Sequence, residues 1–452
     1  MATNFILIDR DTPYILPPCV QDYLPEDHLA RFVVDIVDQL DLLSLTTSYH
    51  GKGKRPYHPA MLVSLLFYGY ATGTFSSRKL EKATYDSMAF KFITANEHPD
   101  HDTINTFRKR FSKEIEGLFV EILVLAEAMG LLKLGTVSLD GTKIKANASR
   151  HKALSWDYAN KLEAQFKQEI EALMKLAEEA DNSQIPEDMK VPEELQRRQD
   201  RLEVITRAKK EIKARAKARY ESEKADYDEK IAKREKKYSE TGKKSGGKKP
   251  QVPSEEPQAK DQVNLTDEES RIMPTKSGFE QAYNAQASVD INTHLIVAHD
   301  VTQHTNDKQE IVPALDKLKQ LPDSLGIVEN LLADTGYFSE ANVNVCDEAN
   351  ITPYITQKRH SHNQPLKQRH VHEAEKNESG LSAVEAMTHR LKTKKGKALY
   401  AKRKSTVETV FGIIKHIQGF RQFHLRGLES VKCEWNLVSI GWNLKRMHVL
   451  KG

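Results

Sequence analysis

The chain has 452 residues, which is enough for two or three domains with a sizeable core. Its 68 basic residues nearly cancel its 64 acidic residues, so the net charge is only +4 and any affinity for nucleic acid must come from local clusters of charge. Three scattered cysteines argue against disulfides and structural zinc, and no apolar run approaches the roughly 20 residues of a membrane span. We therefore expect a cytoplasmic protein without a signal peptide.

Residues 22–130 have the pattern of a helical domain. Apolar side chains recur at helical spacing after Pro25 and again after Pro59, and proline is well suited to the first turn of a helix. Two further segments, which begin near Ser76 and Asp102, have capping residues followed by basic side chains. Such basic helix starts suit a helix-turn-helix reader of DNA, but the same spacing is compatible with a plain helical bundle whose lysines are solvated.

A strand is predicted at residues 136–139, where polar and apolar residues alternate. The strand is expected to end at Asp140, which is followed by Gly141. An acid in that position would be exposed at the edge of a sheet and held by rigid backbone. Asp140 is therefore the first candidate for a catalytic or metal-binding residue.

Residues 151–277 interrupt the strand pattern. Apolar residues at helical spacing, broken by a proline-bounded turn, predict two helices that form an antiparallel coiled-coil hairpin. The second helix has a basic run in which Lys209, Lys213 and Lys217 share one face, and these side chains could contact DNA phosphates without reading sequence. The alternative is the ordinary solvated face of a coiled coil. Residues 242–260, rich in Gly, Pro and Lys, are expected to form a flexible basic linker.

The strand pattern returns after this linker. Residues 283–290 and 294–301 are predicted to form a hairpin, and residues 328–333 a strand that ends at Asp334. Helices are expected on both sides of that last strand. Asp334 thus repeats the arrangement of Asp140, an acid directly after an apolar strand.

A third acid, Glu408, lies in a helical pattern that covers residues 398–420. Apolar residues form a stripe along this helix, and Glu408 lies beside the stripe. In the final segment Trp435 and Trp442 are seven residues apart, a spacing that favours packing in the core over stacking on bases.

These features together resemble the DDE transposases of bacterial insertion sequences, whose RNase H-like fold is shared with retroviral integrases. The resemblance rests on Asp140 after a strand, Asp334 in LLADTGY and Glu408 in VETVFGIIK, and extends to the blocks LPPCVQDYLPEDHLARFVVDIVDQLDL and AYNAQASVD. It implies an α/β fold with a mixed catalytic sheet, and a helical N-terminal domain that binds the ends of the mobile element. It also implies at least a homodimer in the complex with DNA, where the protein would be associated with the nucleoid.

The resemblance further implies a reaction in which water nicks the element ends and the freed 3′ hydroxyl then attacks another strand. Such phosphoryl transfer uses two divalent ions about 3.5 to 4 Å apart. Magnesium, or manganese in its place, prefers hard carboxylate oxygens. We expect Asp140 to bridge the two ions, as the family fold implies, and Asp334 and Glu408 each to bind one of them.

Many related transposases have a Tyr, an Arg, the Glu and a Lys in one motif, with the Arg four residues before the Glu and the basic side chains on DNA phosphates. Lys415 fits this motif because it follows Glu408 by two helical turns. Tyr400 and Arg403 are each one residue further from Glu408 than the motif requires. In a continuous helix Arg403 would lie about 140° from Glu408 and Lys404 only about 40°. Lys404 is then expected to take the role of the Arg, unless the helix begins after it or bulges there. The alternative is that both are solvated charges at a helix start.

Four segments follow from this interpretation. Residues 1–130 are predicted to form the helical DNA-binding domain and residues 131–150 the first part of the catalytic domain. The inserted hairpin and linker occupy residues 151–277, and residues 278–452 complete the catalytic domain with the C-terminal helices.

Other interpretations of the sequence are a transposase-derived DNA-binding or scaffold protein without cleavage activity and a simple RNase H-type nuclease. The three acids argue against the former, and the N-terminal domain and the insertion have no role in the latter. A zinc site is a separate possibility at two His-x-His pairs in a basic loop, His360, His362, His370 and His372. No Cys or carboxylate completes that pattern, so a basic loop near DNA is the better interpretation.

Overall fold

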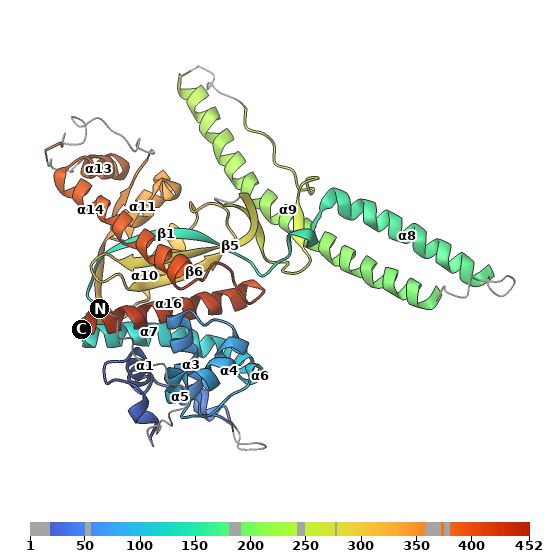
Figure 1. The fold of residues 1–452 in the computed structure, drawn as a ribbon. Coiled ribbons are helices and arrows are strands. Elements are labelled where there is room, and N and C mark those ends of the chain that lie inside the picture. The colour runs from blue at the N-terminus through green and yellow to red at the C-terminus, as the bar shows by residue number, and fades with distance from the viewer. Residues whose placement is uncertain are drawn as a thin grey trace, which may run out of the picture. The chain divides into compact units, whose positions relative to one another are not determined.

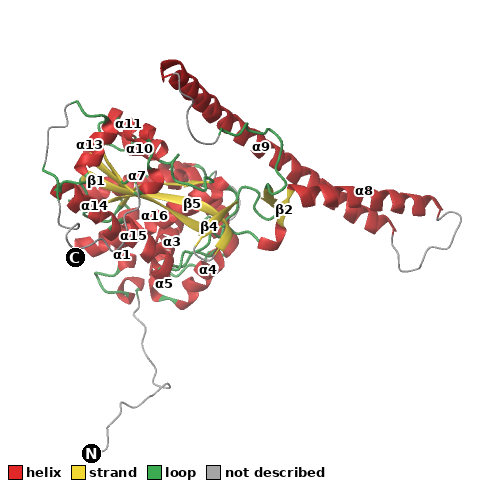
Figure 2. Ribbon diagram, turned by 90° about the horizontal axis from the view of Figure 1, so that it is seen from above, coloured by secondary structure: helices red, strands yellow, loops and turns green. Residues whose placement is uncertain are grey.

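In the computed structural model, residues 19–49, 56–179, 191–241, 249–275, 278–357, 372–374 and 380–452 are described. The chain divides into two units, whose helices and strands are labelled in Figure 1 and coloured by type in Figure 2. The first unit consists of Met1–Ile144, Asn284–His424 and Glu429–Gly452. The second consists of Lys145–Tyr283 and Leu425–Leu428.

The described residues before the first strand are helical, as the apolar spacing predicted. The α-helices are α1 (Leu29–Val37), α2 (Leu43–Thr47), α3 (Pro59–Thr72), α4 (Ser77–Asp86), α5 (Met88–Ile93), α6 (His101–Arg110) and α7 (Ser112–Ala128). The most buried of them is α3. It begins with Pro59 in the first turn and ends at Gly73, whose φ of 84° gives the left-handed conformation that glycine adopts most easily.

The basic helix α6 begins before the predicted position, because Asp100 caps it with a 2.6 Å hydrogen bond from a backbone N–H of the first turn. Two of its basic side chains have partners within the same unit. Arg108 is buried and donates to the Tyr70 hydroxyl over 3.0 Å, and Arg110 donates to the Ser48 carbonyl over 2.8 Å. These two charges therefore stabilise the helical packing, which leaves fewer cations for DNA than the sequence suggested.

The sheet confirms the predicted α/β fold with an RNase H-like order of strands. Its strands are β1 (Leu134–Lys145), β5 (Gly278–Asp290), β6 (Ile296–Thr302), β7 (Gly326–Ala333) and β8 (Thr352–Ile355). They lie in the order β6-β5-β1-β7-β8, with β6 antiparallel to β5, and β7 parallel to both β1 and β8. The additional strand β4 (Arg271–Thr275) pairs with the first residues of β5, which belong to the second unit.

Helices α10 (Ile311–Lys319), α11 (Glu340–Glu348) and α13 (Ala383–Arg390) accompany the sheet, and α16 (Leu428–Lys451) is the long C-terminal helix (Figure 1). The Trp435 ring is fully buried and donates to the Gln286 carbonyl of β5 over 3.1 Å, and Trp442 is buried as well. The predicted core role of both tryptophans is confirmed.

The N-terminal helices and the sheet fall in one unit, so the predicted domain boundary near residue 130 does not separate two compact bodies. The physical reason is the close packing of α16. A Cβ atom on Gly441 would lie 2.7 Å from the backbone nitrogen of Ala71 in α3, and the Asn436 amide donates to the Ile115 carbonyl of α7 over 3.0 Å. The C-terminal helix thus binds the N-terminal helices directly.

The second unit contains the predicted helical hairpin. It consists of α8 (Trp156–Glu179) and α9 (Val191–Thr241), next to the short strands β2 (Ala153–Ser155) and β3 (Gln262–Asn264). Glu169 pairs with Arg198 and Glu163 pairs with Lys209, so one residue number falls as the other rises and the two helices are antiparallel. Of the predicted linker, residues 249–260 have neither helix nor strand, and residues 242–248 lie outside the described residues.

The cysteines and the apolar helices were both the subject of expectations from composition. Cys19, Cys346 and Cys433 are free thiols, and burial raises the pKa of Cys346 to about 12, as expected for an unreactive side chain. In the described parts of the chain, no helix is both long enough and apolar enough to cross a membrane.

Candidate active site

The parallel pairing of β1 with β7 brings the first two acids together. Ser138 is the last residue of β1 in register with β7, where it aligns with Leu332. Asp140 and Asp334 each follow this last pair by two residues, so both carboxylates project beyond it at the same end of the sheet. The prediction that Asp140 ends its strand is wrong, because β1 continues to Lys145 as the neighbour of β5 after the pairing with β7 stops.

Each carboxylate is oriented by the glycine that follows it. Asp140 accepts a 2.8 Å hydrogen bond from the backbone N–H of Gly141, and Asp334 accepts one of 2.7 Å from that of Gly336. A backbone donor fixes the direction of the carboxylate more firmly than a mobile side chain does, because it belongs to the sheet edge itself. This arrangement gives a physical reason for the Asp-Gly and Asp-Thr-Gly sequences.

Glu408 lies just after a break in the helical segment, so residues 398–420 do not form one continuous helix. The segment consists of α14 (Lys394–Ser405), α15 (Val407–Gly412) and a π-helical turn at Ile413–Ile417. Thr406, with φ −104° and ψ −94°, separates the first two. The hydroxyl groups of Ser405 and Thr406 donate back to the Lys402 carbonyl over 3.0 and 2.7 Å, which competes with the helical hydrogen bonds at this point.

The break turns Arg403 toward the acids. Its Nη1 atom lies 3.3 Å from Oδ2 of Asp140, and its Nη2 atom lies 2.6 Å from Oε1 of Glu408. Lys404 is exposed to solvent. Because the segment breaks at Thr406, the condition under which Lys404 was preferred is not met, and Arg403 is the residue that contacts the acids.

The other two residues of the motif also contact the strand ends. The Tyr400 hydroxyl is 3.1 Å from that of Thr356, which is 2.9 Å from the hydroxyl of Thr335, the neighbour of Asp334 in sequence. Lys415 donates to the Thr142 hydroxyl and, over 2.8 Å, to the Lys143 carbonyl, both just after Asp140 in β1. The structure thus brings Tyr400, Arg403, Glu408 and Lys415 to the strand ends that carry the two aspartates.

The electrostatics of this site favour a bound cation. Burial raises the pKa of Asp140 to about 7; the Arg403 guanidinium opposes the shift, and the carboxylates of Asp334 and Asp307 add to it. The donors are carboxylate oxygens, the ligands that magnesium prefers, so the residues present fit a divalent ion. Among the described residues, however, no three His, Cys, Asp or Glu side chains lie close enough to hold an ion together. Arg403 contacts both Asp140 and Glu408.

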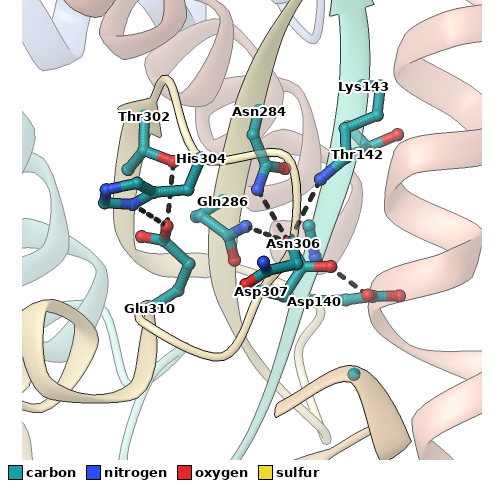
Figure 3. Close-up of polar contacts among 12 residues, drawn as sticks. Asp140, Thr142, Lys143, Asn284, Gln286, Thr302, His304, Asn306, Asp307 and Glu310 are labelled. Atoms are coloured by element: carbon teal, nitrogen blue, oxygen red, sulfur yellow. Dashed lines mark hydrogen bonds and ion pairs between the residues drawn. The ribbon is translucent and has the colours of Figure 1, made fainter. Parts of the chain in front are cut away.

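Asp307, in the loop between β6 and α10, was not predicted from the sequence. Its Oδ1 atom accepts hydrogen bonds from Lys143 over 3.3 Å, from Asn284 over 2.7 Å and from Gln286 over 2.9 Å (Figure 3). A signal was present in AYNAQASVD, where Asn284, Gln286 and Ser288 occupy alternate positions of a strand whose other residues are small or apolar. Polar side chains on one face of a buried strand indicate a polar site on that face.

The remaining predicted DNA contacts lie in α9 of the second unit and have different surroundings. Lys209 forms an ion pair with Glu163, and its Nζ atom lies 5.0 Å from the centre of the Trp156 ring. Lys213 lies 5.7 Å from the same ring, and Lys217 is exposed. Of the four histidines considered for zinc, His360, His362 and His370 lie outside the described residues.

Comparison with known families gives two matches. Residues 18–110 match a model described as a transposase domain, and residues 336–448 match one described as a transposase DDE domain. The second match begins two residues after Asp334 and includes Glu408 with its motif. No match was found among curated proteins or among solved structures. The two transposase models, matched in this order, and the RNase H-like sheet together support an insertion-sequence DDE transposase.

Proposed function

We propose that this transposase binds the terminal inverted repeats of its own element and catalyses metal-dependent DNA cleavage followed by strand transfer. The observation that supports the proposal most is the convergence of Asp140, Asp334 and Glu408, from three distant parts of the sequence, on one end of the sheet. Carboxylates repel one another, so bringing three of them together makes folding less favourable. A shared task with a cation explains their approach.

The proposed roles follow from position. When bound, two magnesium ions supply the charge neutralisation and the activated water or 3′ hydroxyl that phosphoryl transfer requires. Asp140 lies on the central strand, and its side chain is less exposed than that of Glu408, which suits a carboxylate shared by both ions. Asp334 follows the neighbouring strand β7 and Glu408 lies in α15, so each suits one ion.

Arg403 is proposed to hold a DNA phosphate once its carboxylate partners hold cations. A guanidinium presents paired N–H donors whose geometry matches phosphate as well as carboxylate. Lys415, which is anchored to β1 beside Asp140, adds a second positive charge at the same place, and Tyr400 supports the Asp334 side through Thr356.

The element ends are proposed to bind outside this centre. Arg78 and Lys79 are exposed at the start of α4, within the segment that matches the transposase domain. In the second unit, Lys213 and Lys217 are the exposed members of the three lysines singled out in α9. Lys213 lies 5.7 Å from the Trp156 ring, so Lys217 is the one best suited to a phosphate. A homodimer would bring the two ends of the element together for the reaction.

The test uses the purified chain, magnesium and DNA that carries the inverted repeats of the element. Asp140→Asn, Asp334→Asn and Glu408→Gln should each lower cleavage at least about 10³-fold, because each removes a metal ligand from the transition state. DNA binding should be retained. The control is Asp316→Asn, which removes an exposed carboxylate on α10 and should leave cleavage unchanged.

Two outcomes would contradict the assignment. A variant of one of the three acids that cleaves like the wild type removes that residue from the site. A wild-type protein that binds the repeats but never cleaves them would favour a transposase-derived DNA-binding protein.

A further inference from the structure

We propose that Asp307 is a fourth carboxylate of the reaction centre and supplies its Oδ2 atom, beside Asp334, to a divalent cation. This inference rests on the proposed function, because it concerns the same metal site. It adds a ligand that the three acids of the family pattern do not include.

The backbone around Asp307 is fixed by a compact set of hydrogen bonds. In the loop between β6 and α10, the buried carboxylate of Glu310 lies 2.7 Å from Nδ1 of His304 and 3.0 Å from the Thr302 hydroxyl (Figure 3). The backbone N–H of Glu310 donates to the Asp307 carbonyl over 3.1 Å. The loop therefore presents the Asp307 side chain from a defined position.

The side chain itself is oriented through one of its two oxygens. Three donors lie within 3.3 Å of Oδ1, namely the ammonium of Lys143 and the side-chain amides of Asn284 and Gln286. Gln286 is held in turn by the Tyr337 hydroxyl. Within the described part of the chain, Oδ2 accepts no hydrogen bond, although the side chain is only 22% exposed. A carboxylate held in this way has one oxygen free for a ligand.

The free oxygen faces the end of the sheet where the catalytic aspartates lie. A Cβ atom on Gly336 would be 3.6 Å from Oδ2 of Asp307 and 2.8 Å from Oδ1 of Asp334. A Cβ atom on Gly141 would be 2.7 Å from Oδ1 of Asp307. Asp307 thus fits between the two glycine turns, and a larger residue in either turn would displace a carboxylate.

A second observation points to a ligand at the same place. Asn284 is fully buried, and its Oδ1 atom has no hydrogen-bond partner among the described residues, although its amide nitrogen is bonded to Asp307. That oxygen would lie 2.9 Å from a Cβ atom on Gly141, so it faces the turn after Asp140. Buried polar atoms are normally paired, and an amide oxygen is an acceptable ligand, directly or through water, for a hard cation.

The alternative role for Asp307 is an anchor that only neutralises Lys143 and orders the two amides of β5. Both roles predict some loss of cleavage when Asp307 is changed, so activity alone does not distinguish them. Binding of a metal does, because an anchor contributes no ligand.

The experiment measures binding of Mn²⁺ to the full chain, free and bound to DNA of the element ends, by calorimetry and electron paramagnetic resonance. Asp307→Asn should weaken Mn²⁺ binding at least about 10-fold. Asp316→Asn removes the same charge from the exposed face of α10 and should bind Mn²⁺ like the wild type. Should Asp307→Asn fail to fold, Asp307→Glu keeps the charge but displaces the free oxygen, and it should show the same loss.

The outcomes separate this inference from the proposed function. Unchanged Mn²⁺ affinity in the folded Asp307 variant, with weaker binding in Asp334→Asn, would overturn the fourth ligand and leave the three-acid centre in place. A wild-type protein that binds no Mn²⁺ in either state, or one whose Asp140→Asn and Asp334→Asn variants bind it normally, would overturn both.

Discussion

At the scale of single residues, Arg403 supplies a positive charge between two of the acids of the site. Its guanidinium contacts Asp140 and Glu408 at the same time, which offsets the repulsion between two carboxylates at the end of the sheet. Burial keeps the pKa of Asp140 raised to about 7, even with Arg403 beside it. A divalent ion that enters must therefore compete with Arg403 for these two carboxylates.

The first prediction concerns the choice between Arg403 and Lys404. Arg403→Ala should lower cleavage about 100-fold, as expected for loss of a preorganised charged donor near the reacting phosphate. Lys404→Ala should stay near the wild-type rate, because its side chain is exposed beyond the break at Thr406. End-cleavage assays on the two variants check this. A larger loss for Lys404→Ala would mean that the helix becomes continuous when DNA binds.

The site was predictable where it depends on strands. Asp140 and Asp334 follow strands that can be identified in the sequence. The parallel pairing of these strands brings the two carboxylates to the same end of the sheet. The position of Arg403 was not predictable, because the break at Thr406 depends on hydroxyl groups that bond back to the chain, and the same residues also occur inside helices. Asp307 was missed because it lies in a loop, where periodicity gives no information.

At the scale of elements, the basic run of α9 is largely occupied by partners within its own unit. Lys209 pairs with Glu163, Arg215 with Glu211, and Arg219 with Asp261. The Trp156 ring lies against both Lys209 and Lys213. Much of the charge that suggested phosphate binding therefore stabilises the helical pair.

The second prediction separates the two uses of charge in α9. Lys217→Gln should reduce the slope of log affinity against log salt by about 0.9, the effect of one lost phosphate contact. Lys209→Gln should leave that slope unchanged and lower the free energy of unfolding by about 1 kcal/mol, since it loses an ion pair and a contact with an aromatic ring. DNA titrations at several salt concentrations and thermal unfolding measure both. Equal slope changes in the two variants would show that DNA displaces Glu163 from Lys209.

Elements whose apolar residues recur at regular spacing were predicted well, and irregular elements were not. The hairpin of α8 and α9 follows from apolar spacing, and its predicted antiparallel direction is confirmed by pairs such as Glu169 with Arg198. The extension of β1 past Asp140 was missed because a distant strand, β5, is its partner there. Local sequence does not contain that information.

At the scale of the whole first unit, His299 of β6 connects elements from both ends of the chain. Its Nε2 atom lies 2.9 Å from the Asn436 side chain of α16, and the Phe119 ring of α7 packs edge-on 4.5 Å away. Burial is the main cause that lowers the pKa of His299 to about 3. The positive charge of Lys317 contributes to this shift, and Asp300 opposes it. The imidazole is therefore neutral in the folded protein at neutral pH.

The third prediction is a loss of stability in acid that depends on this histidine. The unfolded chain binds a proton at His299 near pH 6.5, whereas the folded chain does so only near pH 3, so stability falls as the pH drops through this interval. The largest possible effect is about 1.4 kcal/mol per pH unit. Chemical denaturation between pH 7 and 5 should show a flatter dependence for His299→Gln. The exposed His416→Gln should retain the wild-type slope, and equal slopes in all three proteins would contradict the argument.

The break at Thr406 also affects how sequences with this motif can be identified. Arg403 is five residues before Glu408, yet its guanidinium contacts that carboxylate, because the unwound residue absorbs the additional length. A search pattern with a fixed number of positions between the Arg and the Glu would reject this protein. The chemistry requires only that the guanidinium reaches the carboxylate, and here an unwound Thr accommodates the additional residue.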